Sequence, residues 1–306
     1  MKKKAKEKFD IYAEITGKII EALDRDIVPW HRPWMGGDCI PRSLATGRPY
    51  GGVNTIMLAL AGYSSPYWAT FKAIKALGGN VVQGETSSMA VFFKWLNVED
   101  VDPVTGVKEK KKIPLLRGFR VFNLEQAENI PADKLPGDAF PVIESVDWNP
   151  VKKAEELLTE AVEADRIPPV QHDGGGRAFY RPSSDSVHLP ARDRFDTAGG
   201  YYGVTFHELG HATGHSSRLN RGLDTKPTGF GSKSYSREEL VAELTAAFLC
   251  GETGLDSSES LDNSASYIDG WRSKLSKDKK LIVTAAAQAQ KASNWIKGTH
   301  FSQTSK

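Results

Sequence analysis

The stretch His207-Glu208-Leu209-Gly210-His211 decides the class of fold predicted for this chain of 306 residues. Two histidines four positions apart lie on one face of a helix, so both imidazoles can bind the same metal ion. Glu208 is turned partly off that face, where its carboxylate can act as a general base toward water beside the metal. The pattern H-E-x-x-H is typical of zinc metallopeptidases and predicts metal-assisted hydrolysis. In the plainer alternative, both histidines hydrogen-bond to carbonyl groups on an ordinary helix.

The residues on either side of the motif favour the metal site. Residues 201–206 are aromatic and apolar, as expected for a helix that is buried on one side. Gly214 follows at a position typical of the residue that ends a helix. The motif is therefore expected on a buried helix of about three turns.

Two histidines leave the metal short of protein ligands, so a third ligand is expected. The longer pattern H-E-x-x-H-x-x-G-x-x-H would place a histidine at position 217, but the chain has Ser217 there. His215 comes two residues too early and beyond the expected helix end. The gluzincin solution, in which a glutamate comes from a second helix downstream, fits better.

Residues 236–249 predict that second helix, with an apolar stripe at helical spacing. Glu239 and Glu243 fall along one edge of the stripe, while Glu238 points to the far side. We expect Glu239 to be the third ligand. Glu243, one turn later, would hold a histidine N–H and is the runner-up as ligand. In the alternative, Ser236 and Glu239 form a capping box, and Glu239 only bonds the start of the helix.

Length and composition set the frame around this site. The chain is long enough for two domains, and its 40% hydrophobic content can fill their cores. A net charge of +2 predicts no particular partner. Cys39 and Cys250 do not suggest a disulfide framework, and no apolar run is long enough to cross a membrane. A cytoplasmic location is expected.

The order of the predicted elements indicates an α+β fold in two domains. We expect a mixed α/β domain over residues 1–125, a linker rich in proline and acidic residues over 126–150, and a gluzincin-like domain over 151–306. A small sheet would precede the H-E-x-x-H helix. The predicted helices cover residues 9–26, 54–61, 66–77, 151–165, 258–275 and 278–296, and the predicted strands lie near 81–82, 90–95, 119–124, 169–171, 178–180 and 186–189.

Aromatic and basic residues alternate in the N-terminal half, a pattern that suits single-stranded nucleic acid. Bases stack on the rings while cations follow the phosphates. In the alternative, most of these rings simply belong to the core and the charges lie on a solvated face. The candidate DNA-binding residues are Trp30, Arg32, Trp34, Arg42, Arg48, Tyr50, Trp68 and Lys72.

Several longer motifs together resemble a known family, the antirestriction proteins of the ArdC type. In the C-terminal half the resemblance rests on residues 207–215, 218–221 and 236–243. In the N-terminal half it rests on Pro29-Trp30 with Arg32-Pro33-Trp34, on Pro49-Tyr50-Gly51-Gly52-Val53-Asn54, and on Gly62-Tyr63-Ser64-Ser65-Pro66-Tyr67-Trp68. The resemblance covers nearly the whole chain.

The resemblance implies a plasmid-borne protein that binds single-stranded DNA through its N-terminal domain. Such a protein would protect incoming DNA from host restriction during conjugative transfer. The C-terminal domain would have a gluzincin-like metallopeptidase fold. Family membership names no cleaved protein, so proteolysis does not follow from it.

Two hypotheses of different classes remain. In the first, the chain is a metallopeptidase that cuts a DNA-bound protein such as a restriction enzyme, with Glu208 as base and Tyr235 as a candidate for stabilising the oxyanion. In the second, the chain shields DNA by binding it, and the metal site only supports the fold or regulates it. The expected metal is Zn²⁺, although two histidines and a carboxylate also accept Mn²⁺ or Co²⁺.

Overall fold

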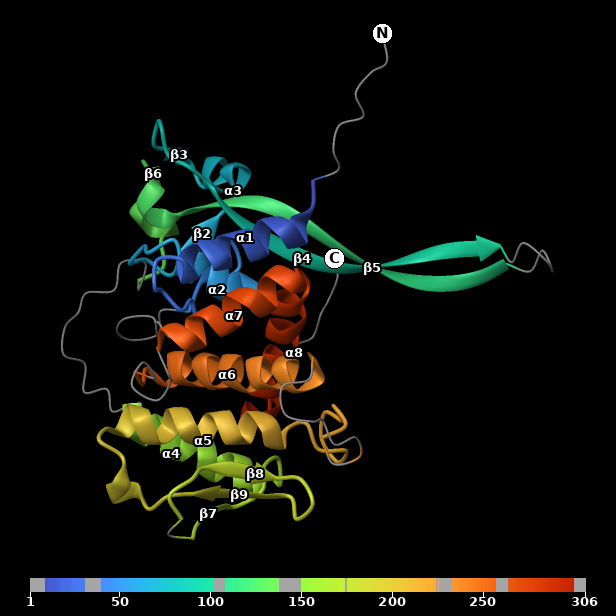
Figure 1. The fold of residues 1–306 in the computed structure, drawn as a ribbon. Coiled ribbons are helices and arrows are strands. Elements are labelled where there is room, and N and C mark those ends of the chain that lie inside the picture. The colour runs from blue at the N-terminus through green and yellow to red at the C-terminus, as the bar shows by residue number, and fades with distance from the viewer. Residues whose placement is uncertain are drawn as a thin grey trace.

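The computed structural model describes residues 9–30, 40–101, 108–137, 150–173, 175–223, 225, 233–256 and 264–299. The described elements form the expected α+β architecture. A four-stranded sheet lies at one end, a three-stranded sheet lies at the other, and helices fill the space between them (Figure 1). No helix in these residues is both long and apolar enough to cross a membrane.

The N-terminal half begins with α1 (Ile11–Leu23), which matches the helix predicted there. The Asp10 carboxylate caps it by accepting hydrogen bonds from the backbone N–H groups of Tyr12 and Ala13, at 3.1 and 3.2 Å. Its apolar face, including Ile15 and Ile19, is buried. A second helix, α2 (Val53–Ala59), follows.

The larger sheet has the strand order β1 (Arg42–Ser43), β2 (Tyr67–Ala69), β5 (Lys108–Asn123), β4 (Ser88–Val101). Strands β4 and β5 form a long antiparallel hairpin that projects from the body of the molecule (Figure 1). The Asn54 side chain closes the outer edge of β4, because its amide donates to the Val91 carbonyl and accepts from the Val91 N–H, both at 2.7 Å. This capped edge is protected against pairing with another strand.

One helix in this half, predicted over residues 66–77, begins later than predicted. Residues 67–69 belong to β2, and helix α3 (Phe71–Ala76) begins only after Thr70, whose hydroxyl caps it. Tyr67 and Trp68 are buried because β2 pairs with β1 on one side and β5 on the other. Pairing on both sides overrides the local helical pattern.

The predicted linker is partly folded structure. The 3-10 helices η1 (Leu124–Gln126) and η2 (Ala132–Lys134) frame β6 (Ala127–Glu128), which pairs with β3 (Asn80–Val81). Residues 126–137 therefore pack on the N-terminal half and do not act as a spacer. Residues 138–149 lie outside the described residues.

The C-terminal half starts with α4 (Pro150–Glu163) and the sheet β7 (Val170–His172), β9 (Ser186–Leu189), β8 (Phe179–Arg181), in that spatial order. Strand β8 lies at one edge. The remaining elements are η3 (Arg192–Arg194), α5 (Ala198–Ala212), α6 (Lys233–Thr253), α7 (Ala265–Lys277) and α8 (Leu281–Lys297).

The largest hydrophobic core is shared between the two halves of the chain. Ile15 and Ile19 of α1 and Ile56 of α2 belong to the same buried cluster as Leu244 of α6 and Trp271 of α7. A second cluster holds α4, α5 and the small sheet against the far side of α6. Helix α6 therefore lies between the two cores, which fixes its position from both sides.

Candidate metal centre

Two helices, α5 and α6, bring the predicted ligands together. Thr197 caps α5 by accepting a hydrogen bond from the Gly200 N–H at 3.0 Å. Within the motif, Gly210 allows close approach, since a Cβ there would lie 3.0 Å from the Cα of Ala242 on α6. A residue with a side chain would hold the helices apart, so the glycine of the motif sets the distance across which the ligands meet.

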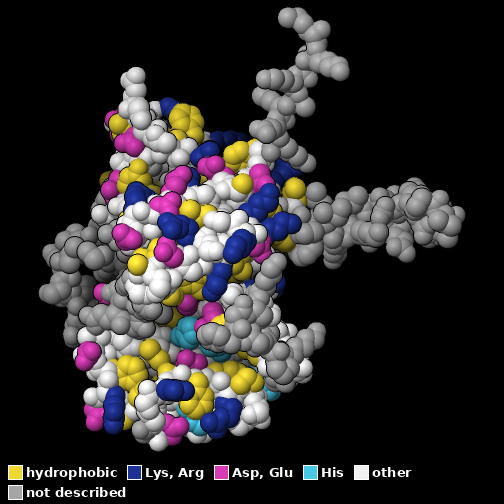
Figure 2. Space-filling model, in the orientation of Figure 1, with side chains coloured by type: hydrophobic (Ala, Val, Ile, Leu, Met, Phe, Trp, Pro, Cys, Tyr) yellow, Lys and Arg dark blue, Asp and Glu magenta, His cyan; other side chains and the backbone are white. Residues whose placement is uncertain are grey.

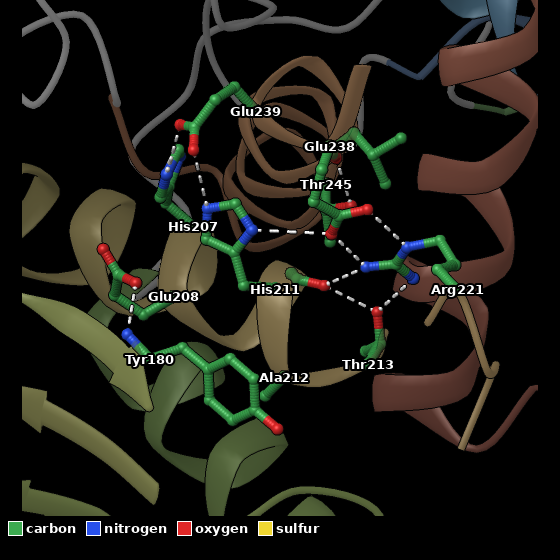
Figure 3. A network of polar contacts seen from close by, with 12 residues as sticks. Tyr180, His207, Glu208, His211, Ala212, Thr213, Arg221, Glu238, Glu239 and Thr245 are labelled. Atoms are coloured by element: carbon green, nitrogen blue, oxygen red, sulfur yellow. Dashed lines mark hydrogen bonds and ion pairs between the residues drawn. The ribbon is translucent and has the colours of Figure 1, made fainter. Parts of the chain in front are cut away.

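His207, His211 and Glu239 converge, as Figure 3 shows. One carboxylate oxygen of Glu239 lies 3.7 Å from Nε2 of His207, and the other lies 3.6 Å from Nε2 of His211. These separations are too long for hydrogen bonds. With one ligand atom taken from each residue, the three atoms lie within 4.8 Å of one another and so surround one small space. The donor set therefore fits a divalent cation.

The two histidines have different surroundings. Burial, followed by the neighbouring His211, lowers the pKa of His207 to about 3, so its imidazole is neutral at physiological pH. Burial also acts to lower the pKa of His211, but the hydrogen bond to Glu238 and the nearby carboxylates raise it above its ordinary value. Within the described residues, Nδ1 of His207 is buried without a hydrogen-bond partner. Among the described residues, the Nδ1 atom of His211 has a partner, Glu238, whereas the Nδ1 atom of His207 has none.

Glu238 holds His211, which corrects the prediction that it faces away. Its carboxylate lies 3.4 Å from Nδ1 of His211 and accepts two hydrogen bonds from the guanidinium of Arg221, at 2.6 and 2.9 Å (Figure 3). Arg221 also donates to the Gly210 carbonyl at 2.7 Å and to the Thr213 hydroxyl at 2.9 Å. Arg221 therefore ties the end of α5 to α6 and fixes the carboxylate that orients the histidine.

The role predicted for Glu243 is wrong. Its carboxylate accepts a hydrogen bond from the indole N–H of Trp30 at 2.8 Å and another from the hydroxyl of Tyr267. Burial raises the pKa of Glu243 to about 7. Glu243 thus joins the N-terminal half to α6 and α7 and orients neither histidine.

Glu208 lies beside the three ligands on the side of the small sheet. Its side chain accepts a hydrogen bond from the backbone N–H of Tyr180 in β8 at 2.8 Å. Burial raises its pKa above the ordinary value. The hydrogen bond holds one oxygen of this carboxylate in place. Because the pKa is raised, the other oxygen can take up and release a proton.

The structure also shows the contacts and positions of other polar residues near the site. Tyr235 hydrogen-bonds to Glu239, and burial raises its pKa to about 12, so the phenol stays protonated at neutral pH. Helix α6 begins at Lys233, so Ser236 lies inside the helix and the capping-box alternative for Glu239 does not apply. His188 is buried between Asp173 and Ser186, as a structural histidine would be.

Of the candidate DNA-binding residues that the structure describes, two aromatic side chains are buried. Trp30 and Trp68 are each 2% exposed, which contradicts a stacking role for these rings in this conformation. Tyr50 is half-buried, and burial raises its pKa to about 12. Arg42 is half-buried, Arg48 and Lys72 are exposed, and Arg32 and Trp34 lie outside the described residues.

Two protein-family models match successive parts of the chain. The model described as the N-terminal domain of anti-restriction factor ArdC matches residues 9–122, and the model of a zincin-like metallopeptidase matches residues 153–288. The metal-free crystal structure of antirestriction ArdC protein from the R388 plasmid is 36% identical. The similarity covers 94% of this chain and 97% of that one, with a TM-score of 0.72. The Mn(II)-bound structure is 33% identical, with the same TM-score.

Other proteins are similar to this chain in sequence over nearly its whole length. An uncharacterized protein, y4eC of Sinorhizobium fredii, is 33% identical over 94% of this chain and 91% of its own length. The DNA primase TraC of Escherichia coli is 34% identical over 95% of this chain, which spans only 27% of that relative. Fold and site thus define a two-domain protein with a zincin-like metallopeptidase domain. The chain belongs to the ArdC family of antirestriction proteins.

Proposed function

We propose that the C-terminal domain is a metal-dependent peptidase. The observation that carries this proposal is the convergence of His207, His211 and Glu239 at 3.6–3.7 Å beside the carboxylate of Glu208. A divalent cation held there would polarise a substrate carbonyl and lower the pKa of a nearby water molecule. The donor set accepts Zn²⁺, Mn²⁺ or Co²⁺.

The residues of the chain supply the proton transfers. Glu208, with its pKa raised by burial, takes the proton from the attacking water and returns it to the leaving amine. The N–H of Tyr180 holds one of its oxygens in place. Tyr235, protonated at neutral pH and next to Glu239, can donate a hydrogen bond to the oxyanion.

Replacing Glu208 with Gln tests this proposal, because the variant lacks the base and keeps every ligand. We expect cleavage of a fluorogenic peptide library in the presence of each cation to fall by about two to four orders of magnitude. The amount of bound metal should not change. Glu160→Gln on α4 is the matched control and should cleave like the wild type. A metal-loaded wild type that cleaves no peptide, or an equally active Glu208→Gln variant, would overturn the proposal.

We further propose that the chain binds single-stranded DNA without sequence preference and protects incoming plasmid DNA from restriction in the cytoplasm. Membership of the ArdC family and the likeness to a protein of the R388 plasmid support this role. A protein bound to DNA, such as a restriction enzyme, is the proposed peptide substrate.

A restriction assay separates this account from the DNA-shield hypothesis. Unmodified plasmid is transferred into a restricting host that carries wild type or Glu208→Gln. We expect lower protection by the variant, since the shield would remain and the peptidase would be lost. Equal protection at equal protein level would favour the shield, with a structural or regulatory metal site.

A further inference from the structure

A cleft of about 310 Å³ lies where the start of α1 meets the base of the β4–β5 hairpin. Its walls are mainly apolar and two arginines border it. Gly118 contributes backbone only, so the lack of a side chain leaves space in the cleft. The lining residues are Phe9, Ile11, Met89, Arg117, Gly118, Phe119 and Arg120.

One exposed ring continues this surface along β4. Phe92 and Phe93 are each 43% exposed, although phenylalanine is usually buried. Consecutive strand residues point to opposite faces, so each face of the hairpin base carries one ring. The strand register places Phe93 on the same face as Met89, Gly118 and Arg120 of the cleft, whereas Phe92, Arg117 and Phe119 share the other face.

The charge of the hairpin complements a polyanion. Among the side chains of β4 and β5 that the structure describes, Lys94, Arg117 and Arg120 are basic and none is acidic. Within the described part of the chain, neither Arg117 nor Arg120 forms an ion pair, so both guanidinium groups can bind a ligand. On the face in view, Lys and Arg side chains lie next to hydrophobic ones near the base of the hairpin (Figure 2).

We propose that this surface is the single-strand binding site, with an unpaired base in the cleft, a base stacked on Phe93, and a phosphate on Arg120. The inference rests on the proposed DNA binding and names its interface, which differs from the set predicted from the sequence. Exposed rings favour a single strand over a duplex, because paired bases do not present their faces.

Three full-length variants test the site against a fluorescent oligo-dT strand, with binding measured by anisotropy over a range of salt concentrations. Phe93→Ala should weaken binding about tenfold. Arg120→Gln should reduce the slope of log K against log salt by roughly 0.7, the value of one lost phosphate contact. Gly118→Leu should also weaken binding, because a Cβ there already lies 3.4 Å from Sδ of Met89 and a longer side chain fills the cleft.

Two controls should bind like the wild type. Phe92→Ala removes an equally exposed ring on the opposite face, and Lys152→Gln with Arg194→Gln removes two exposed charges elsewhere. All variants should melt near the wild-type temperature. If the wild type does not bind oligo-dT, the proposed DNA binding fails and this inference fails with it. If the wild type binds and the three variants match the controls, only the interface is overturned. Equal binding of a duplex by wild type and Phe93→Ala would overturn stacking.

Discussion

At the scale of single residues, Glu238 decides how well His211 is held. We expect Glu238→Gln to weaken metal binding about 10- to 100-fold, because a neutral amide supports the histidine less well than a carboxylate does. Calorimetric titration with Zn²⁺ and Mn²⁺ measures the affinity. Glu163→Gln, on the exposed end of α4, is the control. Unchanged affinity would show that the contact between Glu238 and His211 does not support the metal.

Glu243 should make stability depend on pH. Burial raises its pKa from an ordinary 4.5 to about 7, so between these values the folded chain holds a proton that the unfolded chain has released. Stability is therefore lost as the pH rises through this window. In metal-free protein we expect Glu243→Gln to match the wild type near pH 4.5 and to be up to about 3 kcal/mol more stable near pH 8. Equal denaturation midpoints at both pH values would contradict this.

The sequence could predict the candidate ligands that the structure brings together, because each lies at a clear position on a predicted helix. His207 and His211 are four residues apart, and Glu239 lies on a second helix of clear periodicity. The sequence could not show whether Glu238 or Glu243 contacts the second ring nitrogen of a histidine. Periodicity places a side chain relative to the apolar stripe of its own helix, whereas the position of His211 depends on the packing of α5 against α6.

At the scale of elements, the contact between α5 and α6 depends on Gly210. We expect Gly210→Ala to destabilise the chain by about 1–3 kcal/mol, because its Cβ would lie 3.0 Å from a backbone atom of Ala242. Gly270 on α7 is the matched control, since a Cβ there meets nothing within 4 Å. Gly270→Ala should stabilise by about 0.5–1 kcal/mol. Denaturant unfolding measures both, and shifts of the same sign would contradict the packing argument.

Local signals predicted most helices but misplaced one element. Asp10 and the apolar residues of α1 lie within a few residues and fix that helix locally. Tyr67 and Trp68 lie in a strand only because β1 and β5, distant in sequence, pair with β2. The burial of Trp30 has the same origin, since its partner Glu243 lies in the other half of the chain. Neither fact is visible in a local pattern.

At the scale of the whole molecule, the shared core couples the N-terminal half to the metal helices. Ile19 of α1 is fully buried in the cluster that includes Leu244 of α6, one turn beyond Glu239. Ile74 of α3 is equally buried, but its cluster contains only residues of the N-terminal half. The two isoleucines therefore allow a matched comparison of coupling between the halves.

We expect Ile19→Ala and Ile74→Ala each to lower stability by about 2–5 kcal/mol, since both leave a cavity in a packed core. Only Ile19→Ala should also speed hydrogen exchange of the α6 amides under native conditions, because its cavity borders the core that holds α6. Exchange followed by mass spectrometry, peptide by peptide, resolves α6 from α3. Equal protection of α6 in both variants would mean that the halves open independently. Faster exchange with Ile19→Ala alone would mean that changes in α1 reach α6, the helix that carries Glu239, through the shared core.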